Sequence, residues 1–265
     1  MGGSLLGPYA PLAVNRPFVA LWVAQAVSLV GDRVHQVALA VMVLGLTGDP
    51  ALVGLVFVAA TLPRLLVGPI AGVYVDRYDR RIVMVATDLA RAGLVLLVPV
   101  AAAASPLLTL PLTFVITSLG LAFRPAKLAA IATIAPDHLG EANAAVQVAD
   151  ALADLAGYPI AAVVTVVLAP VLWVAFVLDS LSYAGSAVLL RRLPPCPVAA
   201  DDARTPFVAG LLEGLRWLRL DRALLEHTLL YAVAMQGMLA AGTSLLVVYA
   251  HDALHDGFPY EAAYA

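Results

Sequence analysis

The sequence predicts an all-α membrane protein, and three observations support this fold class. Of the 265 residues, 62% are hydrophobic and 12% are charged, with a mean hydropathy of +0.94. A single water-soluble core stops growing before it could absorb so much apolar material. Several apolar runs have the roughly 20 residues that a helix needs to cross a hydrocarbon layer about 30 Å thick. The basic residues gather in alternate loops, which is typical of a multi-pass protein.

Apolar runs between charged residues and Pro or Gly breaks predict seven spans, each bounded to within about three residues. The first six are expected at 17–46, 51–75, 82–103, 108–126, 142–168 and 171–190, and the seventh at 223–250. We therefore expect a six-helix transmembrane bundle over 1–190, a cytoplasmic linker over 191–222, and over 223–265 the first span of an incomplete C-terminal bundle. An apolar stripe beside arginines at 207–222 predicts an amphipathic surface helix within the linker.

The basic residues predict the orientation of the spans. Arg16 precedes the first span, three arginines lie between the second and third, and Arg124 and Lys127 are expected between the fourth and fifth. Six more arginines follow the sixth span, whereas the loops at 47–50, 103–107 and 168–170 contain no Lys or Arg. Because cytoplasmic loops retain basic residues, we expect a cytoplasmic N-terminus in the plasma (inner) membrane. Residues 1–15 carry no basic residue, so no cleaved signal peptide is expected.

The loop between the second and third spans is unusually charged for so apolar a chain. It reads "GVYVDRYDRR", with a glycine, three residues, Asp-Arg, two residues and Arg-Arg. These motif positions are Gly72, Asp76, Arg77, Arg80 and Arg81. One interpretation is a positive-inside cluster that orients the hairpin. The other is a structural contact, in which the glycine lets two helices approach and the charged side chains bridge neighbouring helix ends.

The motif resembles the signature loop of the major facilitator superfamily. Further stretches, among them "ATDLARAG", "FRPAKLAAIATIAP" and "FVLDSLSYAGSAVLLRRLP", resemble its exporter subgroup, which includes macrolide efflux pumps and the enterobactin exporter; the likeness runs from residue 16 to about 249. The resemblance implies a twelve-span fold of two six-helix halves, truncated here, with the loop as a cytoplasmic gate. It departs from the family at Asp79, where many relatives have glycine. The antiporter motif of the fifth span survives only as "AGYPIAA".

Ionisable side chains recur at one depth of the spans. Most lie 12 to 15 residues from the expected cytoplasmic helix ends, or roughly 18 to 22 Å, and Asp150 lies at about 12 Å. A charge at the bilayer centre costs at least about 2.5 kcal/mol, so these groups should face the bundle interior. The polar residues expected along a substrate or proton pathway are Asp32, Arg64, Asp88, Arg91, Gln147, Asp150, Asp154 and Asp179.

Different roles are expected within this set. Asp150 and Asp154 share a helix face with Gln147, which makes them the first candidates for cation or proton handling; a wet helix face without a specific role is the alternative. Asp88 and Arg91 are one turn apart and are expected to form a structural ion pair. Asp32 is expected on a cavity-lining helix, and Arg64 as the partner of an acidic residue on another helix. Asp179 is expected in hydrogen bonds between helices.

The remaining composition argues against catalysis and resident cofactors. The single cysteine, Cys196, cannot form a disulfide within the chain, and the five histidines are scattered. No nucleophile with a base, phosphate loop or metal-ligand spacing is present, so we expect no catalytic residues, no metal and no cofactor. A net charge of −3 gives no reason to expect a nucleic-acid partner. The expected partners are the lipid bilayer, a small-molecule substrate and protons.

The sequence therefore predicts a transporter that exports a small organic solute, such as a drug, siderophore or metabolite, by alternating access. Proton coupling is expected because acidic groups outnumber basic ones in the mid-membrane layer. A different class of function stays open: the chain would be a transport-inactive half-transporter, or an accessory that pairs with another membrane protein.

Overall fold

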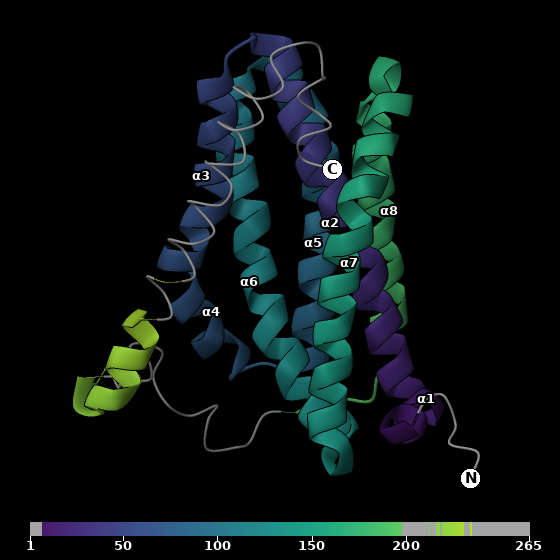
Figure 1. Ribbon diagram of the computed structural model, residues 1–265, viewed down its shortest axis with the longest axis vertical. Helices are drawn as coiled ribbons and strands as arrows, with labels where there is room; N and C mark the ends of the chain where they lie inside the picture. The colour runs from purple at the N-terminus through teal and green to yellow at the C-terminus, as the bar shows by residue number, and fades with distance from the viewer. Residues whose placement is uncertain (1–6, 198–211, 213–215, 218, 231–233, 235–265) are drawn as a thin grey trace. The chain divides into compact units, whose positions relative to one another are not determined.

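The computed structural model describes residues 7–197, 212, 216–217, 219–230 and 234. The chain divides into two compact units, Met1–Arg204 and Thr205–Ala265. Within the described residues of the first unit, all regular structure is helical (Figure 1). The helices are α1 (Ala10–Val14), α2 (Arg16–Thr47), α3 (Pro50–Leu66), α4 (Gly68–Val75), α5 (Arg80–Ala104), α6 (Thr109–Ile134), α7 (Leu139–Val167) and α8 (Trp173–Leu190).

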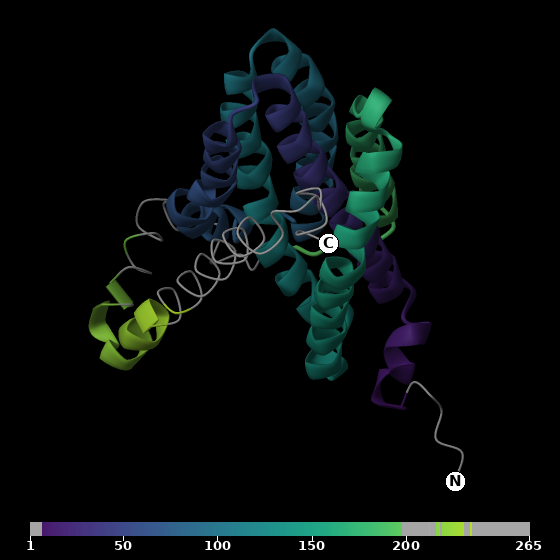
Figure 2. The same cartoon turned by 45° about the horizontal axis from the view of Figure 1, so that its top comes forward.

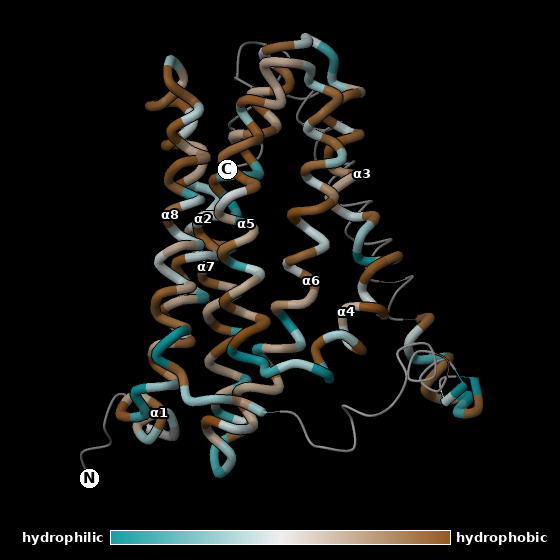
Figure 3. Tube along the Cα trace, turned by 180° about the vertical axis from the view of Figure 1, so that it is seen from behind, coloured by the Kyte–Doolittle hydropathy of each residue, from teal (hydrophilic) through white to brown (hydrophobic). Residues whose placement is uncertain are grey.

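Five helical stretches in the described part of the chain are long and apolar enough to cross a membrane. They are Arg16–Thr47, Arg80–Ala104, Pro106–Ile134, Pro136–Val167 and Trp173–Leu190. Their surfaces expose many large apolar side chains, and brown hydrophobic segments run along the helices in Figure 3. The prediction of an all-α, multi-pass membrane protein is confirmed.

The second predicted span is not one continuous helix. It is divided into α3 and α4, which meet at Val67. Pro69 stands in the first turn of α4 and has no backbone N–H. Within α4 this N–H would have no partner, so its absence costs nothing there. A continuous helix would need it to donate a hydrogen bond back to α3. Hydropathy alone predicts a single span here because the apolar character continues across the break.

The fourth predicted span is too short, and the expected position of two basic residues was wrong. Helix α6 continues to Ile134, so Arg124 and Lys127 lie within the helix and not in the following loop. The Lys127 side chain is buried. Its ammonium lies 3.9 Å from the carboxylate of Asp150 on α7, which offsets the cost of placing a charge there.

Polar side chains cap the N-termini of three helices. The Asn15 side chain accepts a hydrogen bond from the backbone N–H of Phe18, which caps α2, and donates one to the carbonyl of Ile134 at the end of α6. Asp49 caps α3 by accepting from the N–H of Ala51 at 2.9 Å. Asp79 caps α5 in the same way, by accepting from the N–H of Arg81 at 2.9 Å. Each cap satisfies a backbone donor that the helix itself leaves free.

Helix α2 lies at the centre of the packing. It contacts α7 on one side and α8 on another, while α5 packs between α8 and α6 (Figures 1 and 2). The α3–α4 pair packs on α6. Two apolar clusters form the core, one containing Leu21, Met84 and Ile131, the other Val43 and Val95. Asp32 on α2, and Asp88 and Arg91 on α5, fall between these two clusters along their helices.

The second unit is described over a short stretch only. Residues 222–230 are helical, and Asp221 caps this segment by accepting from the N–H of Leu224. Arg222 and Glu226, one turn apart, form an exposed ion pair of 2.7 Å. Most of the seventh span predicted at 223–250, and part of the predicted amphipathic helix, lie outside the described residues.

Candidate functional site

A group of buried polar side chains joins α2, α5 and α8; we call it the buried polar cluster. The guanidinium of Arg91 on α5 donates to the carboxylate of Asp32 on α2 at 2.9 Å. The hydroxyl of Tyr183 on α8 donates to the same carboxylate, and the Arg91 guanidinium lies 4.1 Å from the centre of the Tyr183 ring. Arg91 also lies 3.9 Å from Asp88, one turn earlier on α5. The cluster comprises Asp32, His35, Asp88, Arg91, Asp179 and Tyr183.

The second half of the cluster is a histidine–carboxyl pair. His35 Nδ1 on α2 lies 3.4 Å from Asp179 Oδ2 on α8, and the Asp179 side chain is 0% exposed. The ring of Phe176, one turn before Asp179, contacts the His35 ring edge-on at 5.3 Å between centroids. The contact between His35 and Asp179 is not a hydrogen bond, because neither His35 Nδ1 nor Asp179 Oδ2 has a hydrogen-bond partner among the described residues.

Gly31 makes the close approach of α2 and α8 possible. A methyl group added there would collide with the Ser182 hydroxyl and would lie 2.5 Å from Asp179 Oδ1. A larger residue at position 31 would therefore push α8 away from α2. The glycine of the sequence motif behaves differently, because a methyl group on Gly72 would meet no described atom within 4 Å. Among the described residues, the close helix approach lies at Gly31, next to the cluster residue Asp32.

A second polar group lies between α2 and α7. Arg33 Nη2 lies 2.5 Å from Asp154 Oδ1, and its Nε donates to the same oxygen. The Arg33 guanidinium lies 5.3 Å from the Tyr158 ring centre, and the aliphatic part of its side chain lies against Gly157, leaving no room for a Cβ there. Half of the Asp154 side chain, 53%, is exposed. This ion pair is the most open charged group that the two helices share.

Asp150 lies one turn earlier on α7. It accepts a hydrogen bond from the side-chain amide of Gln25 on α2 and lies near Lys127 of α6. Together with the Arg33–Asp154 pair it forms what we call the α2–α7 polar face. Gln147 is exposed on α7, and Arg64 is exposed on α3 without an ion pair to any described residue.

The structure groups the predicted pathway residues differently from the sequence. Asp32, Asp88, Arg91 and Asp179 meet in the buried polar cluster, whereas Asp150 and Asp154 lie on the other side of α2. The predicted Asp88–Arg91 pair is present as a longer contact, because the nearer partner of Arg91 is Asp32. Sequence analysis missed Gln25 and misplaced Lys127. Gln25 precedes Arg33 by eight residues, a spacing at which two residues share a helix face, and both side chains contact α7.

The charged loop between α4 and α5 contacts the chain segment after α8. Arg80 Nη1 donates to the carbonyl of Pro197 at 2.6 Å, and Arg81 Nη1 to that of Leu193 at 2.9 Å. Asp79 Oδ2 accepts from the N–H of Cys196 at 3.1 Å. We call these three interactions the linker contact. Asp76 ends α4 and is exposed, and Arg77 is partly buried.

Cys196 is buried at the linker contact. Burial raises the pKa of its thiol, and the neighbouring Asp79 carboxyl adds to the increase. At neutral pH the thiol is therefore less ionised than an exposed cysteine and reacts more slowly with electrophiles.

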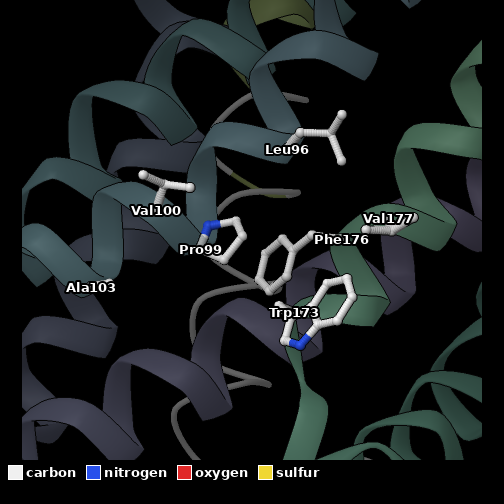
Figure 4. Close-up of a pocket in the computed structure, with 7 residues that line it drawn as sticks. All are labelled: Leu96, Pro99, Val100, Ala103, Trp173, Phe176 and Val177. Carbon is white, nitrogen blue, oxygen red and sulfur yellow. The ribbon is translucent and has the colours of Figure 1, made fainter.

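An apolar groove of about 460 Å³ lies between α5 and α8 (Figure 4). It is lined by Leu96, Pro99, Val100, Ala103, Trp173, Phe176 and Val177. The groove contains no charged side chain, so it offers nothing to orient a polar solute. Its one link to the buried polar cluster is Phe176, which contacts His35. Among the described residues, no group of three or more His, Cys, Asp or Glu side chains could hold a metal ion.

Comparisons with known proteins agree with this architecture. A family model described as transmembrane secretion effector matches residues 6–260. Macrolide efflux protein A of Streptococcus pyogenes is 26% identical over 248 residues, covering 88% of this chain and 56% of that protein. The uncharacterized MFS-type transporter YfiS of Bacillus subtilis (strain 168) is 27% identical over 247 residues, covering 90% of this chain and 58% of that protein. No solved structure matches the chain.

The chain spans just over half the length of these relatives. The family model, in contrast, matches nearly all of the chain, and the all-α bundle with its membrane-length helices fits that match. The chain therefore belongs to the transmembrane secretion effector family of major facilitator transporters and is similar to macrolide efflux pumps.

Proposed function

We propose that this bundle is half of an exporter that moves a small organic solute across the plasma membrane by alternating access. The observation that carries the proposal is the α2–α7 polar face. Asp154 is half exposed at mid-membrane depth with Arg33 beside it, and charged groups at this depth are too costly to face lipid tails. The face must therefore border water, a solute or a second bundle. A solute site between two bundles is the arrangement that transporters with repeated halves use.

The gate is proposed at the loop between α4 and α5. Asp76 and Arg77 stand at the end of α4, and Arg80 and Arg81 hold the segment that leads to the second unit. Rocking of one half against the other would have to break or remake these contacts. We place this loop and the N-terminus in the cytoplasm, as the distribution of basic residues favours.

The solute is proposed to be a drug-like or metabolite-like molecule. One relative is named a macrolide efflux protein, and a partly exposed face with two aspartates favours a cationic or neutral solute over an anionic one. Uptake of protons from outside would supply the free energy for export, with acidic residues of the polar layer as carriers.

An accumulation assay tests this function. Cells with and without the gene are loaded with a panel of fluorescent dyes and antibiotics, macrolides included, and the retained amount is measured. We expect lower accumulation of at least one compound in cells that carry the gene. The alternative, a transport-inactive half or an accessory protein, predicts the same accumulation for every compound although the chain is inserted in the membrane.

The gate is tested by Asp76→Asn. The amide keeps the shape of the side chain but removes the charge, so transport should fall while membrane insertion stays normal. Flux in inside-out vesicles and the amount of inserted protein are the two measurements. Unchanged flux would remove the gate assignment without affecting the proposal of an exporter.

A further inference from the structure

We propose that Asp32 and Asp88 share one exchangeable proton, with the Arg91 guanidinium paired to whichever carboxylate is ionised. This inference rests on the proposed function, because the proton is assigned to the coupling step of export. It moves the proton site from Asp150 and Asp154, the candidates that the sequence favours, to the buried polar cluster.

The first argument is the balance of charge in the cluster. It contains three carboxyl groups, Asp32, Asp88 and Asp179, but one guanidinium. Even with a protonated His35 beside Asp179, one negative charge would be left uncompensated if every carboxyl were ionised. Asp88 and Asp179 are fully buried between α2, α5 and α8, and the Asp32 side chain is only 19% exposed, so solvent stabilises little of the excess charge. At least one carboxyl must therefore hold a proton.

The second argument is the surroundings of Asp88. Its side chain is 0% exposed, and neither carboxyl oxygen accepts a hydrogen bond from a described residue. An ionised carboxylate without a donor is among the most costly groups to bury, whereas a protonated carboxyl is neutral. Ser186 on α8 is buried with an unpartnered hydroxyl beside this carboxyl, and this hydroxyl can accept from a protonated Asp88 or donate to an ionised one.

The third argument is the position of Arg91 between two carboxyls. It lies 2.9 Å from Asp32 and 3.9 Å from Asp88. Asp32 accepts from both Arg91 and Tyr183, so it is the ionised member of the pair in this structure. When Asp32 takes up a proton, its hold on Arg91 weakens. Arg91 can then pair with Asp88, which releases its own proton, so that one proton is bound and one is released.

The other charged neighbours are accounted for. Asp88 interacts with Asp32 from α2 and with Asp179 from α8. Arg33, next to Asp32 on α2, also interacts with Asp32, but its close partner is Asp154 on α7. Helix α6 contributes Gly120, which contacts the Arg91 guanidinium without carrying a charge. The carboxyls of the α2–α7 polar face each have a cation, Arg33 for Asp154 and Lys127 for Asp150. They lack the surplus of acid that requires a bound proton.

Infrared spectroscopy tests this proposal without relying on transport. The purified protein in lipid nanodiscs is measured at neutral pH, where a protonated carboxyl gives a C=O stretch that is distinct from the carboxylate bands and shifts in D₂O. We expect a protonated-carboxyl band that is lost in Asp88→Asn. Asp32→Asn should also remove the Asp88 band, because Arg91 is then free to pair with Asp88 and ionise it. Asp154→Asn is the matched control and should leave the band unchanged.

The outcomes separate the two proposals. If Asp88→Asn removes carboxylate bands instead, or if Asp32→Asn leaves the protonated band in place, the shared proton is refuted whatever the transport assay gives. If Asp88→Asn does not fold, the Asp32→Asn spectrum decides alone. If the band behaves as expected but no compound is exported in the accumulation assay, the proton site stands and the proposed function fails.

Discussion

Arg91 shows how a single residue can contact side chains of three helices at once. Its guanidinium has two carboxyl neighbours on different helices, together with the ring of Tyr183 against its face. A planar donor group suits this position because it can bond to one carboxylate while it stacks on an aromatic ring. Lysine would keep the charge but lose the stacking and the second donor, so the substitution would not be conservative here.

At the same scale, Gly31 is predicted to be intolerant of even one extra methyl group. Gly31→Ala places a Cβ against Ser182 and Asp179, and overpacking of this kind typically costs about 1–3 kcal/mol. The matched control is Gly93→Ala on α5, whose Cβ would meet nothing within 4 Å; it should be neutral or should stabilise by up to about 1 kcal/mol. Thermal unfolding in detergent measures both. Equal midpoints for the two variants would contradict the close α2–α8 contact.

At the scale of the element, the loop between α4 and α5 joins the start of α5 to the segment after α8 at one end of the bundle. Asp79 uses one carboxyl oxygen to cap α5 and the other to hold the N–H of Cys196. The family resemblance places glycine at this position in many relatives, and glycine could do neither. The aspartate is therefore a feature of this chain that ties the segment after α8 to the start of α5.

Asp79→Gly is predicted to free Cys196. The substitution removes the acceptor of the Cys196 N–H and a negative charge that raises the pKa of the thiol. Both changes favour the thiolate, so maleimide labelling at neutral pH should become several-fold faster. In the unaltered protein, labelling should accelerate only as pH rises through the elevated thiol pKa. Asp137→Gly, at an exposed aspartate in the α6–α7 connection, is the control and should label at the original rate.

Some helix ends could be predicted from the sequence and others could not, because different interactions determine where each helix ends. The spans at α2, α5, α7 and α8 follow from hydropathy, since apolar runs and polar ends coincide there. The break at Val67 could not be predicted that way, because it depends on backbone hydrogen bonding at Pro69. The end of α6 was placed too early because a charged residue is usually a loop residue. Lys127 is instead paired with Asp150 on α7, and hydropathy does not predict such a contact between two helices.

For the candidate site, the sequence predicts the depth of the ionisable residues in the membrane but not their partners. Counting residues from the helix ends predicts that the ionisable groups share a mid-membrane layer. Which of them meet depends on the rotation of each helix about its axis, and small differences in rotation change the partner. Asp32 and Arg33 are adjacent in sequence, yet Asp32 pairs with Arg91 on α5 and Arg33 pairs with Asp154 on α7. No residue count distinguishes those two partners.

At the scale of the whole molecule, the two polar groups suit the two binding steps proposed for an exporter, proton binding and solute binding. The buried polar cluster joins α2, α5 and α8 within one bundle, whereas the α2–α7 polar face is open at Asp154. A proton site benefits from burial, because a low dielectric makes its charge state sensitive to its partners. A solute site needs access. Helix α2 contributes to both, so movement of α2 offers a physical route between proton binding and solute binding.

The last prediction tests whether the α2–α7 polar face is wet in the membrane. Ala151 and Leu152 are both exposed on α7 at nearly the same depth. Ala151 lies on the same side as Gln147 and Asp154, whereas Leu152, which is 51% exposed, lies on the opposite side from Asp154. Cysteine labelling requires thiolate, which forms in water but not among lipid tails. In a Cys196→Ala background, Ala151→Cys should therefore react with a water-soluble maleimide and Leu152→Cys should not. Equal reactivity would mean that α7 presents no aqueous face, and the solute pathway would have to lie elsewhere in the protein.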